Sequence, residues 1–92
     1  MILDEIDKKI LIENYDKYLI NQIDPNNVSK IFNYLKNNGV YYAKDLLLNS
    51  LDLFLYPFEE FKKKFEHLKN VLGTDYVNIL GEDVSLIEIM YE

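Results

Sequence analysis

The sequence predicts an all-α fold: a single small helical domain over residues 1–92, made of an N-terminal helix and about two short helical repeats. Apolar residues recur at steps of three and four along much of the chain, which is the spacing of one face of an α-helix. Three glycines and two prolines separate these stretches. Hydrophobic residues make up 49% of the chain, which excludes a disordered protein despite a net charge of −6. We divide the domain into a helix over residues 1–23, a first repeat over 25–57 and a second over 58–92.

The N-terminal stretch, residues 1–23, contains neither glycine nor proline, so one long helix is the simplest interpretation. Its apolar residues fall into two groups that point in roughly opposite directions, about 170° apart at 100° per residue. The later group adjoins the repeats and should pack on them; it comprises Leu11, Ile12, Tyr15, Tyr18, Leu19 and Ile23. The early group is Ile2, Leu3, Ile6 and Ile10. It either faces a partner protein or a second subunit, or a bend near residues 10–13 returns it to the core.

The first repeat should begin with a capped helix, because Asp24 is a good N-cap and Pro25 suits the first helical position. Asn38 and Gly39 should end this helix. A short helix is expected over residues 41–49, and residues 51–57 form either a helical turn or a strand. The expected core positions of this repeat are Val28, Ile31, Phe32, Leu35, Val40, Ala43, Leu46 and Leu47.

The second repeat should begin with a helix over residues 58–73, with Pro57 in its first turn and Gly73 at its end. Its apolar stripe is Phe58, Phe61, Phe65, Leu68 and Leu72. We expect Thr74 to cap a brief helix that Gly81 ends, and a further helix over residues 83–91. Phe65→Ala and Phe32→Ala should destabilise the domain to a similar extent.

The two repeats can be aligned with each other. Phe32 matches Phe65 and Lys36 matches Lys69 at an offset of about 33 residues, and Tyr42 matches Tyr76 one residue later. Further along, Leu51 is aligned with Leu86 and Phe54 with Ile89. A period of this size is typical of stacked helical repeats.

The aligned order, F-x-x-L-K-N-x-G, a short helix and a leucine-rich turn ending in L-F-L-Y-P, resembles the helical repeat of the mitochondrial transcription termination factor family. The resemblance covers residues 28–90. It implies a curved array of short helices and, for that family's best-known members, nucleic-acid binding through a basic concave face. This chain departs from that pattern, since its pI is near 4.7 and all ten basic residues are lysines.

The residue types argue against an enzyme and predict no cofactor. The chain has no cysteine and a single histidine, His67, so it lacks the ligands of a typical transition-metal site. No glycine-rich phosphate loop or nucleophile motif is present.

The N-terminus carries acids where a signal peptide carries positive charge, and no apolar run reaches the length of a membrane span. We therefore expect a cytoplasmic protein that does not associate with membranes.

We expect the protein to act by binding another protein, or as a homo-oligomer, through the early N-terminal group together with Tyr41 and Tyr42. Tyrosines are enriched at interfaces, although core or core-edge positions are their commoner use. One version of this hypothesis is an inhibitor encoded by a phage or other mobile element. Two alternatives are an acidic mimic of nucleic acid and nucleic-acid binding through a lysine patch. That patch would comprise Lys30, Lys36, Lys62, Lys63 and Lys69.

Overall fold

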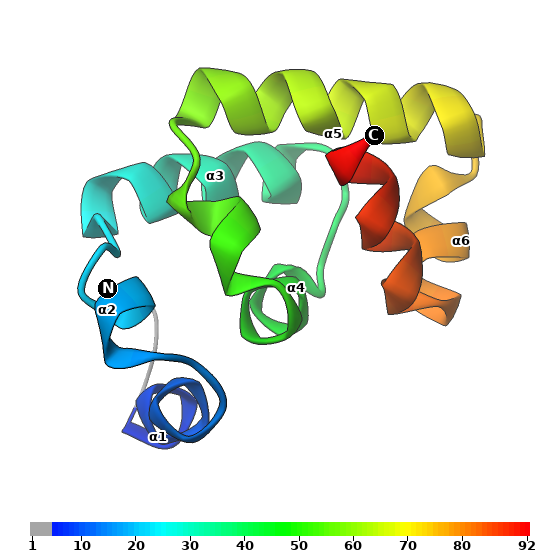
Figure 1. Ribbon diagram of the computed structural model, residues 1–92. Helices are drawn as coiled ribbons and strands as arrows, with labels where there is room; N and C mark the ends of the chain where they lie inside the picture. Colours follow the sequence, from blue (N-terminus) through cyan, green and yellow to red (C-terminus); the bar gives the residue numbers. More distant parts are fainter. Residues whose placement is uncertain (1–4) are drawn as a thin grey trace.

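The computed structural model describes residues 5–92 and confirms the all-α fold (Figure 1). Ile2 and Leu3 lie outside the described residues. Within residues 5–92 every regular element is an α-helix or a 3-10 helix. In chain order these elements are α1 (Glu5–Asn14), α2 (Lys17–Ile20), α3 (Pro25–Asn37), α4 (Ala43–Asn49), the 3-10 helix η1 (Leu51–Leu55), α5 (Phe58–Leu72), α6 (Tyr76–Glu82) and the 3-10 helix η2 (Val84–Tyr91).

The prediction of one continuous N-terminal helix is wrong. The chain breaks at Tyr15 and Asp16, shortly after the positions at which a bend is considered above, and α2 follows as a single turn. Asp16 adopts an extended backbone and its carboxylate accepts the N–H of Tyr18 at 2.8 Å, so a polar side chain caps a new helix inside the stretch. Tyr15 fixes the break to the rest of the domain, because its hydroxyl donates to the carbonyl oxygen of Leu48 at 3.0 Å.

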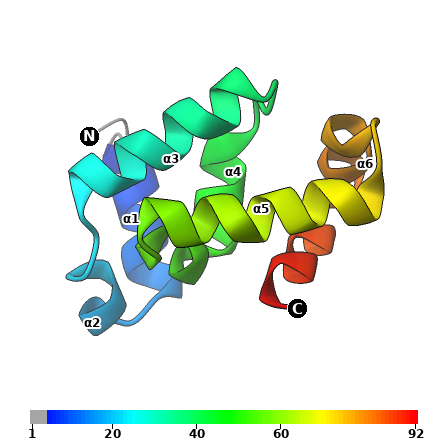
Figure 2. The same ribbon diagram turned by 90° about the horizontal axis from the view of Figure 1, so that it is seen from above.

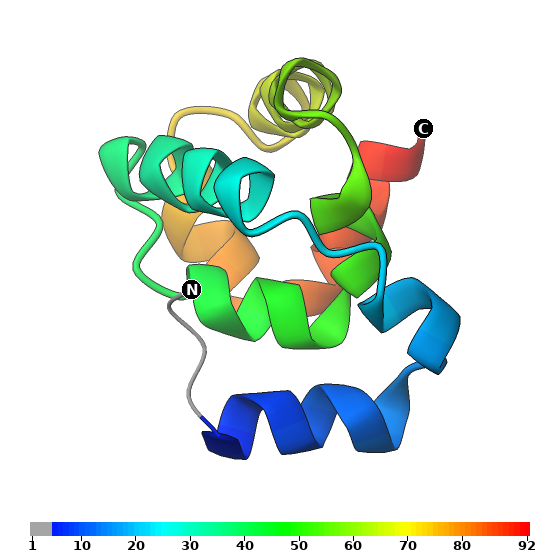
Figure 3. The same cartoon turned by 90° about the vertical axis from the view of Figure 1, so that its left-hand side faces the viewer.

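The break allows most of the later apolar group to reach the core, as expected. Leu11 is buried, and three others are partly buried against the core: Tyr15, Leu19 and Ile23. Ile12 and Tyr18 are exposed instead. The α1 helix runs beside α4, and both are seen end-on in Figure 1 and lengthwise in Figure 3.

Two successive units have the same order of elements: a long helix, a short helix and a 3-10 helix. The first helical unit is α3, α4 and η1, and the second is α5, α6 and η2. Their long helices, α3 and α5, pack against each other (Figure 2), and each 3-10 helix contacts both helices of its own unit. Residues 51–55 therefore form a helical turn and not a strand. A glycine with φ near +85° closes each long helix, at Gly39 and Gly73, where a side chain would be strained.

The expected core is largely confirmed. All eight core positions predicted for the first repeat are buried, and so are Phe61, Phe65 and Leu68 on α5. The two 3-10 helices, however, do not follow the sequence alignment. Leu51 and Phe54 are buried in η1, whereas the buried residues of η2 are Ile87 and Met90, each one position later than the aligned residue.

Two predictions about α6 are wrong. Asp75, not Thr74, occupies the cap position, and its side chain makes no capping hydrogen bond. Gly81 does not end the helix, which continues to Glu82. A Cβ atom at Gly81 would lie 3.1 Å from the Tyr42 ring, so a larger residue there would require this ring to shift.

Candidate functional site

Tyr42 belongs to the core and not to an exposed surface. Only 8% of this residue is exposed, and its hydroxyl donates to the carbonyl oxygen of Val77 in α6. Burial, with a smaller effect of neighbouring Tyr41, raises the pKa of Tyr42 to about 12. Tyr42 therefore does not belong to the predicted partner-binding set. Its match to Tyr76 in the repeat alignment is the sequence signal for this buried role.

A polar network joins the two helical units at the end of α3. The side-chain amide of Asn38 donates to the carbonyl oxygen of Tyr34 at 2.8 Å. Lys69 Nζ donates to Asn38 Oδ1 at 2.9 Å and to Glu66 Oε2 at 3.1 Å. The hydroxyl of Tyr76 donates to the Asn38 carbonyl oxygen at 2.9 Å, and that of Tyr34 donates to Glu66. Together these five residues form what we call the seam network.

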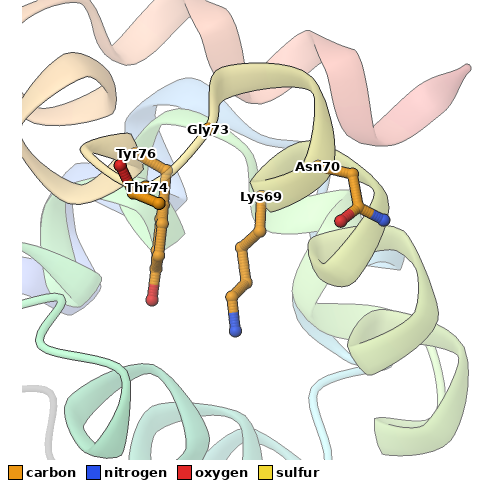
Figure 4. Close-up of a pocket in the computed structure, with 5 residues that line it drawn as sticks. All are labelled: Lys69, Asn70, Gly73, Thr74 and Tyr76. Atoms are coloured by element: carbon orange, nitrogen blue, oxygen red, sulfur yellow. The ribbon is translucent and has the colours of Figure 1, made fainter.

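The seam network borders a shallow hollow of about 450 Å³ at the end of α5 (Figure 4). Its lining residues are Lys69, Asn70, Gly73, Thr74 and Tyr76. Lys69 and Tyr76 extend in the same direction in Figure 4, and the Lys69 amine lies 5.3 Å from the centre of the Tyr76 ring. The amine contacts the Glu66 carboxylate, the Asn38 amide and the Tyr76 ring, so this lysine helps to join the two units.

The charges of the seam network are also matched to one another. The hydrogen bond from Tyr34, followed by that from Lys69, lowers the pKa of Glu66 below its ordinary value. Burial and the same bond to Glu66 raise the pKa of Tyr34. Each group is thus held in the protonation state that keeps the network intact at neutral pH. The network stabilises the fold and leaves its lysine with little capacity for a ligand.

A second hollow, of about 510 Å³, lies between the end of α3 and the start of α4. Its lining, which we call the first-unit groove, is Phe32, Asn33, Lys36, Val40, Tyr41, Ala43 and Lys44. Tyr41 is 85% exposed, and its ring meets that of Tyr42 edge-on at 5.0 Å. An exposed aromatic ring fixed by a buried one is a suitable contact for a partner.

The start of α1 lies at the same end of the molecule as this groove. Asp7 is largely buried, and its carboxylate pairs with Lys44 Nζ at 2.9 Å, which joins the start of α1 to the start of α4 (Figure 3). Ile6 is next to Asp7 and is 71% exposed, while Ile10 is half-buried. Of the predicted partner-binding residues, the structure therefore brings Ile6 and Tyr41 to one end as exposed apolar side chains.

The remaining charged candidates have ordinary surface environments. Glu59 and Glu60 lie four residues before Lys63 and Lys64, a spacing that allows ion pairs along a helix, but neither pair forms among residues 5–92. Lys64 instead places its amine 4.9 Å from the centre of the Tyr56 ring. His67 lies 3.5 Å from a Glu92 carboxylate oxygen.

Neither a metal site nor a membrane span is found in the part of the chain that the structure describes. This part contains no cluster of three His, Cys, Asp or Glu side chains with the geometry of a metal site. Among the helices of residues 5–92, none has the length and apolar character needed to cross a bilayer.

Comparisons with protein-family models, with curated proteins and with solved structures found no match to this chain. The resemblance to the transcription termination factor repeat therefore stays a prediction.

Proposed function

We propose that this protein is a non-catalytic interaction module that binds a protein partner through the end of the molecule that carries Ile6 and Tyr41. The observation that supports the proposal is the exposure of these two side chains, 71% and 85%, on segments that the Asp7–Lys44 pair joins. Removing such apolar area from water is favourable, at about 25 cal/mol per Å². A partner that covers both side chains would therefore gain affinity.

Contacts with buried residues support both segments at this end of the molecule. Asp7 is held by the ion pair to Lys44, and Leu11 is buried one turn further along α1. The Tyr41 ring rests against buried Tyr42. Because these supports already fix the positions of Ile6 and Tyr41, binding would order few additional side chains. We place this activity in the cytoplasm, and inhibition of a target protein is one form it could take.

The proposal is tested by capture of partners with the tagged protein from its source cell, together with sedimentation of the purified protein. Ile6→Asp and Tyr41→Asp should each abolish capture, or convert a self-associated species to a monomer, while thermal melting stays cooperative. Ile12→Asp is the matched control. Ile12 is similarly exposed on the same helix, at 67%, but points about 120° away around the helix axis.

The outcome that contradicts the proposal is a partner that is retained equally by all three variants. The proposal is also wrong if the wild-type protein is a monomer and neither Ile6→Asp nor Tyr41→Asp changes the partners that it captures. Neither residue would then contribute to an interface.

A further inference from the structure

The first-unit groove and the hollow of the second unit share a lysine at matched positions of the alignment, but the surroundings of that lysine differ. Lys36 in the groove corresponds to Lys69 in the hollow. Three residues before Lys69 stands Glu66, which pairs with it at 3.1 Å, whereas the residue three before Lys36 is the neutral Asn33. The first unit thus keeps the lysine and lacks the carboxylate that neutralises its counterpart.

The same contrast extends across the groove. At the positions of Tyr41 and Lys44 in the first unit, the alignment places Asp75 and Asn78 in the second. The seven residues that line the groove include two lysines and no carboxylate, although the whole chain has a net charge of −6. Asp7 of α1 pairs with Lys44 and neutralises it, and exposed Asp45 follows Lys44 on α4, so Lys36 is the groove lysine that has no ion pair among the described residues.

The apolar part of the groove completes a binding surface. Phe32, Val40 and Ala43 are each at most 8% exposed and form its floor, while Tyr41 stands at the rim. A volume of about 510 Å³ falls within the range of roughly 300–1,000 Å³ typical of small-ligand sites. Such a floor suits one apolar side chain, and Lys36 suits a carboxylate beside it.

We propose that the first-unit groove binds an acidic segment of a protein partner, with an apolar side chain on the floor and a flanking carboxylate at Lys36. This inference rests on the proposed function and specifies the chemistry of the partner. The acidity of the remainder of the chain does not prevent it, because charges beyond a Debye length of about 8 Å at physiological ionic strength are largely screened.

The test uses a fluorescein-labelled ten-residue peptide with a central leucine between glutamates, and fluorescence anisotropy as the readout. A matched peptide carries lysines in place of the glutamates, and another carries serine in place of the leucine. The wild-type protein should bind the glutamate–leucine peptide best, and binding should weaken with added salt. Equal binding of the acidic and basic peptides, or binding of neither, would overturn the inference.

The decisive variant is Asn33→Glu, which installs in the first unit the acid that neutralises Lys69 in the second. We expect it to weaken binding of the acidic peptide by about tenfold, and Lys36→Glu to do at least as much. Asn33→Gln and Lys30→Glu are the controls, the latter at an exposed lysine of α3 that does not line the groove. Circular dichroism melts establish that each variant is folded. An equal loss of binding in Lys30→Glu and Lys36→Glu would show a diffuse charge effect and reject the groove.

The two proposals fail in different ways. If no acidic peptide binds but Ile6→Asp still abolishes partner capture, the chemistry assigned to the groove is wrong and the interaction surface stands. If the peptide binds in the manner described but capture is indifferent to Ile6, the groove is supported and the wider surface is rejected.

Discussion

The hollows of the two helical units show how one position changes the use of a matched lysine. Lys69 and Lys36 occupy equivalent sites near the ends of α5 and α3. Lys69 is enclosed by Glu66, Asn38 and Tyr76 and joins the units. Lys36 has Asn33 where Lys69 has Glu66, and it is exposed. Two units with the same order of elements therefore use the matched lysine differently: Lys69 joins the units, and Lys36 is left exposed for the binding that we propose.

The largest effect should distinguish two aligned phenylalanines, Phe65 of the second unit and Phe32 of the first. Phe65 is fully buried and its ring lies 5.8–6.0 Å from those of Tyr34, Phe61 and Tyr76. Phe65→Ala should cost on the order of 3–5 kcal/mol, because the cavity removes ring contacts as well as buried area. Phe32, at 8% exposure, lies against the open groove, so Phe32→Ala should cost about half as much.

Urea denaturation of both variants checks this difference. The predicted difference replaces the simpler expectation, drawn from the alignment, that the two substitutions are equally destabilising. Equal losses of stability would mean that the groove does not reduce the contribution of Phe32, and the contrast between the two hollows would be weakened.

Much of the fold is predictable because local signals and burial agree. Asp24 caps α3 through its carboxylate, and the spacing of Phe61, Phe65 and Leu68 places them correctly on the buried face of α5. The break at Asp16 was not predicted, because no glycine or proline lies near it. Its cause is the hydrogen bond by which the Asp16 side chain caps α2. Gly81 resembles a helix end in the sequence, whereas its role is contact with Tyr42, 39 residues earlier in the chain.

The candidate site is less predictable than the fold. Periodicity and residue type identify Ile6 and Tyr41 as candidate partner-binding residues. Their placement at one end of the molecule depends on the Asp7–Lys44 pair between α1 and α4, which has no sequence signature. The alignment contains the difference between Asn33 and Glu66, but its meaning requires the hydrogen bonds of Lys69.

A second prediction compares the two lysines directly. Lys69→Met should destabilise the domain by about 1 kcal/mol, because it removes hydrogen bonds to Asn38 and Glu66 at a site where only 26% of the side chain is exposed. Lys36→Met should change stability by less than about 0.5 kcal/mol, as expected for an exposed surface position. Thermal melts of the two variants under the same conditions measure the difference. Equal shifts would show that the seam network does not use Lys69 as described.

The lysine run on α5 provides a reference outside both hollows. Lys62 and Lys63 are exposed, and Lys64 contributes a contact with the Tyr56 ring. Replacing all three with glutamine should change stability by less than about 1 kcal/mol and leave partner capture intact. If the folded triple variant loses its partner, the basic-patch alternative is favoured over the surface at Ile6 and Tyr41.

The smallest effect is the pH dependence of stability that Glu66 gives to the seam network. The first unit should show no such dependence at the matched position, because Asn33 stands there. The folded pKa of Glu66 lies below its ordinary value of 4.5, chiefly because of the hydrogen bond from Tyr34. The ionised carboxylate therefore stabilises the fold at neutral pH, and this contribution disappears as the pH falls below 4.5 and through the folded pKa. Because 48% of the Glu66 side chain is exposed, we expect no more than a few tenths of a kcal/mol.

Thermal melts of the wild-type protein and Glu66→Gln between about pH 7 and pH 3 isolate this contribution. The wild-type protein should melt slightly higher at neutral pH, and the difference should shrink toward the acidic end, where the wild-type carboxyl group also becomes uncharged. Glu60→Gln, which removes an exposed carboxylate of the same helix outside the network, is the control. A difference between wild type and Glu66→Gln that persists unchanged in acid would indicate that the glutamate acts through side-chain packing. The charge matching that separates the second unit's hollow from the first-unit groove would then lose its support.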